Sequence, residues 1–135
     1  MNDASPLKLV PRARAQAQLG PAVRRDRTGL SLYALRPYAP GEVVLEFRNL
    51  VWRIDRDQFT VEHPSGAHIF HPLLAKAAHS CEPNTRLDLR QRVMLATRAI
   101  RPDDCISFDY TATERRISHP FDCLCGSRAC RGRIG

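Results

Sequence analysis

The sequence has no apolar stretch that approaches the length needed to span a membrane, and Met1–Val10 lacks the apolar segment of a secretory signal. It has no internal repeat and no sign of a second domain, so its 135 residues predict a single domain. Without a signal, the five cysteines favour a reducing setting, where clustered thiols bind metals more often than they form disulfides. We therefore expect an intracellular, cytoplasmic protein with no membrane partner.

The chain carries a net charge of +7 and has an isoelectric point of about 9.7. This balance suits acidic partners such as nucleic acid, but it also suits a solvated basic surface that keeps the protein soluble. The arginines are spread along the chain and form no single block. A basic zinc-containing nucleic-acid binder would need an aromatic stacking surface or a reading helix, and neither is apparent in the sequence.

Ten prolines and seven glycines predict many turns and short elements, which favours a mainly β fold. Residues 1–25 are rich in Pro, Ala, Arg and Gln and are predicted to form a flexible basic arm. Residues 72–78 are predicted to form a helix of two turns, and Trp52 is predicted to lie in the core. Short strands are predicted at 28–34, 42–47, 51–54, 59–62, 67–70, 85–89, 93–96 and 106–110.

Three cysteines lie close together near the C-terminus, in the pattern C-x-C-x4-C formed by Cys123, Cys125 and Cys130. Cys81 lies far upstream and can complete a tetrahedral zinc site with these three thiols, which would attach the C-terminal segment to the domain. The alternative is a set of free or disulfide-linked thiols. Cys105 is left over and is predicted to be a small buried residue.

Four segments, in this order, resemble motifs of the SET-domain protein lysine methyltransferases. They are residues 29–34 (GLSLYA), residues 39–44 (APGEVV), residues 78–84 (AHSCEPN), and residues 107–110 (SFDY) followed by the cysteine-rich segment. The resemblance is to minimal members with a post-SET zinc tail, and it covers residues 28–135. It implies a SET domain at 26–117 and a post-SET zinc-binding tail at 118–135. The implied fold consists of several small β-sheets, with a C-terminal segment that threads through a loop as a pseudoknot.

The resemblance also implies an activity, the transfer of a methyl group from S-adenosylmethionine to a lysine side chain. Tyr110 matches the catalytic tyrosine. Phe108 matches the position in the lysine channel that sets the degree of methylation, where phenylalanine leaves room for di- or trimethylation. Phe47 falls where the family often carries a channel tyrosine. For Phe108 and Phe47 the alternative is an ordinary core phenylalanine.

Seven residues match positions that contact the cofactor in the family, and two of them depart from the pattern. Ala78 stands where asparagine is usual, and the loss of one hydrogen bond costs about 1 kcal/mol of binding free energy. Ser31 replaces the second glycine of its motif. The matching residues are Gly29, Leu30, Ser31, Leu32, Ala78, His79 and Leu124.

The expected partner is a protein that carries a target lysine, possible examples being a histone or a DNA-associated protein. In that case the location would be nuclear or nucleoid-associated. The substitution at Ala78 also leaves open a non-catalytic SET-like binding module. A homodimer could enlarge the small substrate platform. An acidic groove for a basic substrate could be lined by Asp103, Asp104, Asp109 and Glu114.

Overall fold

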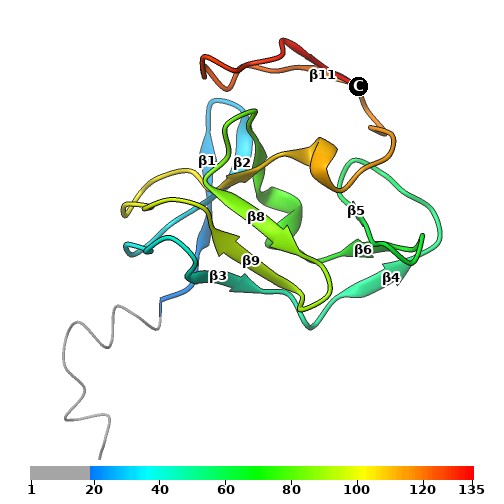
Figure 1. Ribbon diagram of the computed structural model, residues 1–135, viewed down its shortest axis with the longest axis horizontal. Helices are drawn as coiled ribbons and strands as arrows, with labels where there is room; N and C mark the ends of the chain where they lie inside the picture. The colour runs from blue at the N-terminus through cyan, green and yellow to red at the C-terminus, as the bar shows by residue number, and fades with distance from the viewer. Residues whose placement is uncertain (1–18) are drawn as a thin grey trace, which may run out of the picture.

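The structure is a computed structural model that describes residues 19–135 (Figure 1). Short strands and two single turns of 3-10 helix make up its regular structure, which confirms the predicted mainly β class. The elements are β1 (Ala22–Asp26), β2 (Gly29–Tyr33), β3 (Val43–Glu46), β4 (Val51–Arg53), β5 (Val61–Glu62), β6 (His68–Phe70), η1 (Leu74–Lys76), β7 (Ala78–His79), β8 (Thr85–Asp88), β9 (Val93–Ala96), β10 (Ser107–Phe108), η2 (Tyr110–Ala112), β11 (Phe121–Asp122) and β12 (Arg133–Ile134).

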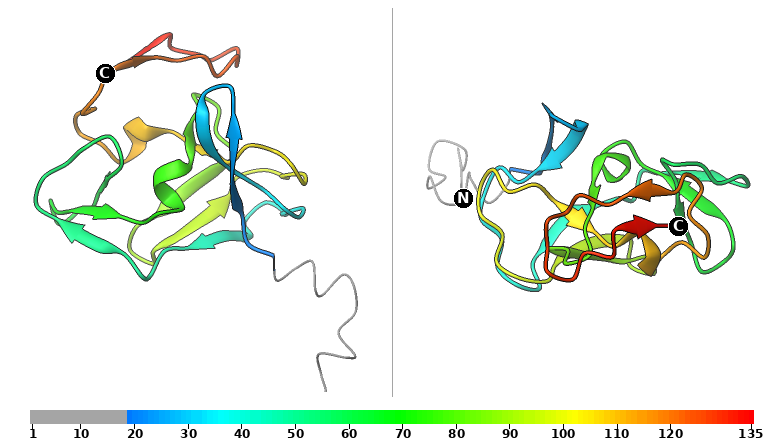
Figure 2. Two further views of the ribbon diagram at one scale, coloured as in Figure 1. Left: turned by 180° about the vertical axis from the view of Figure 1, so that it is seen from behind. Right: turned by 90° about the horizontal axis from the view of Figure 1, so that it is seen from above.

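The strands form five small sheets (Figures 1 and 2). Two sheets have three strands, in the orders β3-β9-β8 and β4-β6-β5, and all of their pairings are antiparallel. β1 and β2 form a hairpin, and β11 pairs with β12 within the C-terminal tail. β7 and β10 pair in parallel although they are distant in the sequence. The threading of the C-terminal segment through a loop stays a prediction.

One hydrophobic cluster lies between these sheets and fixes their arrangement. Alternate side chains of a strand point to opposite faces, so β2, β3, β5, β6, β9 and β10 each contribute one or two buried residues to this cluster. Burial of such side chains is the main favourable term in folding, at about 25 cal/mol per Å² of apolar surface. The fully buried members include Leu32, Phe47, Ile69, Met94, Ile100 and Ile106.

The predicted N-terminal arm at 1–25 is too long at its C-terminal end. Residues 22–25 belong to β1, which pairs along its whole length with β2. Arg24 and Arg25 lower the local hydrophobicity of this segment, so its sequence does not indicate a strand. The pairing with β2 determines its extended conformation. Residues 1–18 of the predicted arm lie outside the described part of the chain.

Three further local predictions are wrong in their detail. The helix predicted at 72–78 is only the 3-10 turn η1, since a segment of this length gains too few hydrogen bonds to propagate a helix. The strand predicted at 106–110 ends at Phe108, and Tyr110 begins η2. Trp52 is 45% exposed because it lies on β4, an edge strand. None of the helical turns within residues 19–135 has the length or hydropathy to cross a bilayer.

Candidate functional site

The parallel pairing of β7 with β10 brings together the two most specific sequence motifs. Ala78 lies opposite Ser107, and His79 lies opposite Phe108. Asn84, at the end of the first motif, secures this arrangement because its Oδ1 accepts a hydrogen bond from the Ser107 N–H at 2.9 Å. Its Nδ2 donates to the Cys105 carbonyl at 2.9 Å. A buried amide with these partners ties the two chain segments at a fixed register.

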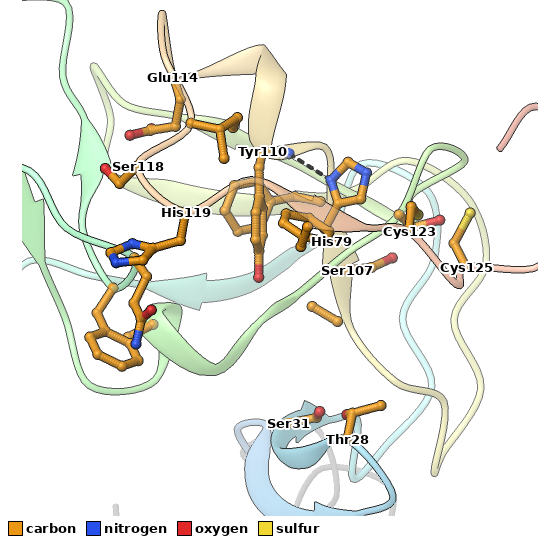
Figure 3. A pocket seen from close by; sticks show the side chains of 18 of the residues that line it. Thr28, Ser31, His79, Ser107, Tyr110, Glu114, Ser118, His119, Cys123 and Cys125 are labelled. Carbon is orange, nitrogen blue, oxygen red and sulfur yellow. Dashed lines mark hydrogen bonds between the residues drawn. The ribbon is translucent and has the colours of Figure 1, made fainter. Parts of the chain in front are cut away.

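A cavity of about 890 Å³ opens beside this pairing (Figure 3). Its wall is formed by the β1–β2 turn, by residues 57–61, by the segments around β7 and β10, and by the first part of the C-terminal tail. Four of the predicted cofactor residues, together with both β10-region aromatic residues, line this one space. They are Ser31, Ala78, His79, Leu124, Phe108 and Tyr110.

The other predicted cofactor and channel residues do not line the cavity. Phe47 is completely buried in the core, so the structure does not place it in a substrate channel. Leu32 is also completely buried, whereas Leu30 is 45% exposed. Gly29 closes the β1–β2 hairpin with a φ of +119°, a conformation that a residue with a side chain rarely adopts. These residues shape the hairpin, while its turn contributes the cavity wall.

Tyr110 is held at three points in the cavity wall. Its hydroxyl donates a hydrogen bond to the Ala77 carbonyl at 2.6 Å, and its backbone N–H donates to His79 Nδ1 at 3.1 Å (Figure 3). Its ring packs on Phe108, with 4.9 Å between the ring centroids. Burial raises the pKa of Tyr110 to about 12. The hydroxyl therefore stays protonated at neutral pH and is directed at a carbonyl oxygen.

The four predicted zinc ligands come together although Cys81 is distant in the sequence from the other three. The sulfur atoms of Cys81, Cys123, Cys125 and Cys130 all lie within 4.8 Å of one another. The Cys81 and Cys123 sulfurs are 3.8 Å apart, close to the spacing of two ligands at about 2.3 Å from a tetrahedral zinc ion. None of the five cysteines is in a disulfide. The cluster therefore fits a structural zinc ion with four thiolate ligands.

The structure also shows cavity residues that sequence reasoning missed. Asp26 lines the cavity next to Ser31, and its carboxylate accepts hydrogen bonds from the Thr28 N–H at 2.8 Å and from the Tyr33 hydroxyl. Hydrogen bonds from the Thr28 hydroxyl, which has the largest effect, and from the Tyr33 hydroxyl hold the pKa of Asp26 far below its usual range. Phe121 packs against His79, with ring centroids 5.5 Å apart. Only the proximity of Asp26 to the 29–34 motif could have suggested its location.

Comparisons with known proteins agree with the fold. No family model and no curated protein matches the sequence. Among solved structures, the chain is similar to KRYPTONITE in complex with mCHG DNA and SAH, with 20% identity and a TM-score of 0.67 over 89% of this chain and 30% of the other. It is also similar to KRYPTONITE in complex with mCHH DNA, H3(1-15) peptide and SAH, with 20% identity and a TM-score of 0.64 over 89% of this chain and 31% of the other.

These similarities show the architecture of the domain. The protein has the SET-domain fold, as the four sequence motifs predict. The chain spans less than a third of the length of the solved structures that it matches.

Proposed function

We propose that this protein is an S-adenosylmethionine-dependent protein lysine N-methyltransferase. The observation that carries the proposal is that one cavity is lined both by the predicted cofactor residues, such as His79 and Leu124, and by Phe108 and Tyr110. The structural neighbours, which are in complex with SAH, support this assignment. Ser31, Ala78, His79 and Leu124 would hold the cofactor.

The bound cofactor would supply an electrophilic methyl group, and the chain's own residues would prepare the lysine amine. Tyr110 and Phe108 present packed apolar rings on their side of the cavity. Burial disfavours the ammonium form and lowers the pKa of a lysine that enters such a site. The Tyr110 hydroxyl and the Ala77 carbonyl, joined at 2.6 Å, offer polar atoms that can orient an amine. Alignment of two bound reactants can supply roughly 7–11 kcal/mol of a barrier.

The acidic residues that line the cavity differ from those that the sequence suggested. Of the four acidic residues named above, only Glu114 lines the cavity. Asp103 pairs with Arg24 at 2.7 Å and Asp109 pairs with Arg131 at 3.0 Å, so their charges are neutralised. Glu114 therefore is the predicted contact for a positive charge near the target lysine. A homodimer stays a prediction, and the mass in solution from light scattering would test it.

The activity can be tested with zinc-loaded protein, radiolabelled S-adenosylmethionine and an array of lysine-containing peptides. We expect the wild type to label a subset of the peptides and Tyr110→Phe to lose most of this labelling. Calorimetry should show that Tyr110→Phe still binds the cofactor, because the hydroxyl faces the Ala77 carbonyl. The proposal is wrong if the zinc-loaded wild type binds no S-adenosylmethionine.

Ala78 supports a second candidate, a non-catalytic SET-like binding module. Its methyl group lines the cavity where an asparagine would offer hydrogen bonds. If the wild type is an enzyme, Ala78→Asn should tighten cofactor binding by about fivefold, the equivalent of one hydrogen bond of about 1 kcal/mol. If binding is measurable by calorimetry only in Ala78→Asn, the natural protein is the binding module.

A further inference from the structure

Arg131 connects the cysteine cluster with the turn that carries Tyr110. Its backbone N–H and its Nε both point at the Cys81 sulfur, at 3.4 and 3.5 Å. Its two terminal nitrogens reach the other way, with Nη2 at 3.0 Å from Asp109 Oδ1 and Nη1 at 3.1 Å from Thr111 Oγ1. One planar guanidinium therefore bridges a predicted zinc ligand and η2.

Asp109 transmits this contact to the backbone of Tyr110. Its side chain caps η2, accepting hydrogen bonds from the Thr111 N–H at 2.9 Å and the Thr111 hydroxyl at 2.7 Å. Tyr110 is the first residue of η2 and directly follows the cap. Because η2 is only one turn long, its orientation depends on such end contacts rather than on internal hydrogen bonds.

His79 provides a second connection between the same two points. Its Nε2 lies 3.5 Å from the Cys81 sulfur, and its Nδ1 accepts the hydrogen bond from the Tyr110 N–H (Figure 3). The His79 side chain is only 2% exposed, so this geometry is fixed by packing. The Tyr110 backbone is thus tied to Cys81 on one side through His79 and on the other through Asp109 and Arg131.

Apart from the Phe121 ring, which packs on Tyr110 with 6.0 Å between the ring centroids, two polar contacts of the tail do not lead to Tyr110. Arg133 lies two residues beyond Arg131 and pairs with Asp122 at 3.0 Å, entirely within the β11–β12 hairpin. Glu82 Oε1 accepts a hydrogen bond from the Ala129 N–H at 3.2 Å, on the side of the tail that contacts the loop after β7. If Arg131 only held the tail in place, its contacts would resemble those of Arg133 and Glu82. Arg131 differs from them because it also contacts Asp109 and Thr111.

We propose that Arg131 is a positioning residue, which makes the orientation of Tyr110 depend on the docked tail and on the state of the cysteine cluster. With the guanidinium in place, Asp109 is fixed between Arg131 and Thr111, and η2 directs the Tyr110 hydroxyl at the Ala77 carbonyl. Without it, the Asp109 carboxylate keeps its cap but loses its anchor on the tail. The inference builds on the proposed function only in giving Tyr110 a catalytic role.

The test is an NMR spectrum of the whole zinc-loaded protein labelled with ¹³C at the tyrosine ring. The sequence has three tyrosines, so Tyr33 and Tyr38 serve as internal references. Arg131→Ala should shift or split the Tyr110 signal and leave the other two unchanged, with a full equivalent of zinc still bound. Arg131→Lys should give a smaller change, because an ammonium cannot contact Cys81, Asp109 and Thr111 together. Arg133→Ala, the matched control, should give the wild-type spectrum.

Asp109→Asn keeps the test decisive if Arg131→Ala binds zinc poorly. This variant leaves all four cysteines and Arg131 in place and removes only the charge that the guanidinium pairs with. It should move the Tyr110 signal in the same direction, and the double variant should add little because both residues act in one pathway. A wild-type Tyr110 signal in zinc-loaded Asp109→Asn would overturn the proposal. This readout requires no turnover, so it is separate from a failure of the proposed activity.

Discussion

Removal of zinc should release the C-terminal tail and leave the rest of the domain folded. Ordering residues 118–135 costs about 18 kcal/mol, at roughly 1 kcal/mol of backbone entropy per residue. The tail buries few side chains in return, chiefly Ile134, which is 2% exposed and contributes about 2–3 kcal/mol. A structural zinc site with thiolate ligands contributes about 10–16 kcal/mol. The two favourable contributions together amount to about 12–19 kcal/mol, and the zinc site supplies most of this.

Hydrogen exchange measured by mass spectrometry, with and without a strong chelator under reducing conditions, would check this prediction. We expect the amide hydrogens of β11 and β12 to exchange rapidly once zinc is removed, while those of the β3-β9-β8 sheet stay protected. Cofactor binding should be lost at the same time, because Cys123, Leu124 and Cys125 form part of the cavity wall. Continued protection of the tail in protein shown to be free of zinc would refute the reasoning.

Two predictions concern the core and the ion pair between Glu62 and Arg115. Phe47→Ala should lower the free energy of unfolding by about 3–5 kcal/mol, because the ring is completely buried. The control is Ile54→Ala, at a side chain that is 93% exposed, and it should change this free energy by less than about 0.5 kcal/mol. Urea titrations of both variants would measure the difference. The hydrogen bond from the Arg115 backbone N–H, and then the one from its guanidinium, lower the pKa of Glu62 from its usual value. A lowered carboxyl pKa stabilises the fold fully above the ordinary pKa of the group and loses this effect as the pH falls through the lowered pKa. The stability advantage of wild type over Glu62→Gln should therefore stay constant from about pH 7 to about pH 5 and shrink as the pH falls further. An advantage independent of pH would show that the charge of Glu62 contributes nothing.

Local sequence patterns predicted the elements whose partners are close in the chain. The hairpin of β8 and β9 has residues of alternating character on both sides of a short polar turn, and its register follows from that pattern. β1 could not be found in this way, because Arg24 and Arg25 interrupt any apolar pattern and only the pairing with β2 makes the segment a strand. Short strands depend strongly on such tertiary contacts.

The candidate site shows the same division between local and long-range information. Spacing alone grouped Cys123, Cys125 and Cys130, and their chemistry called for a fourth ligand, which Cys81 provides in the structure. Phe47 could not be placed from sequence, because its position after β3 does not reveal whether its ring faces the cavity or the core. Arg131 was equally hidden, since its role depends on Cys81 and Asp109, which approach it only in the folded chain.

The net charge of +7 did not predict the charge of the ligand, because the charged residues that line the cavity differ in sign from the overall charge of the chain. Asp26 and Glu114 line the cavity, and neither forms an ion pair with another residue in the described range 19–135. Hydroxyl donors keep Asp26 ionised, while burial raises the pKa of Glu114, and a bound positive charge would lower it again. A cavity with such carboxylates favours cationic ligands even in a basic protein, since the nearby charges act at short range and distant ones are screened. Both a sulfonium cofactor and a lysine-bearing substrate have that charge.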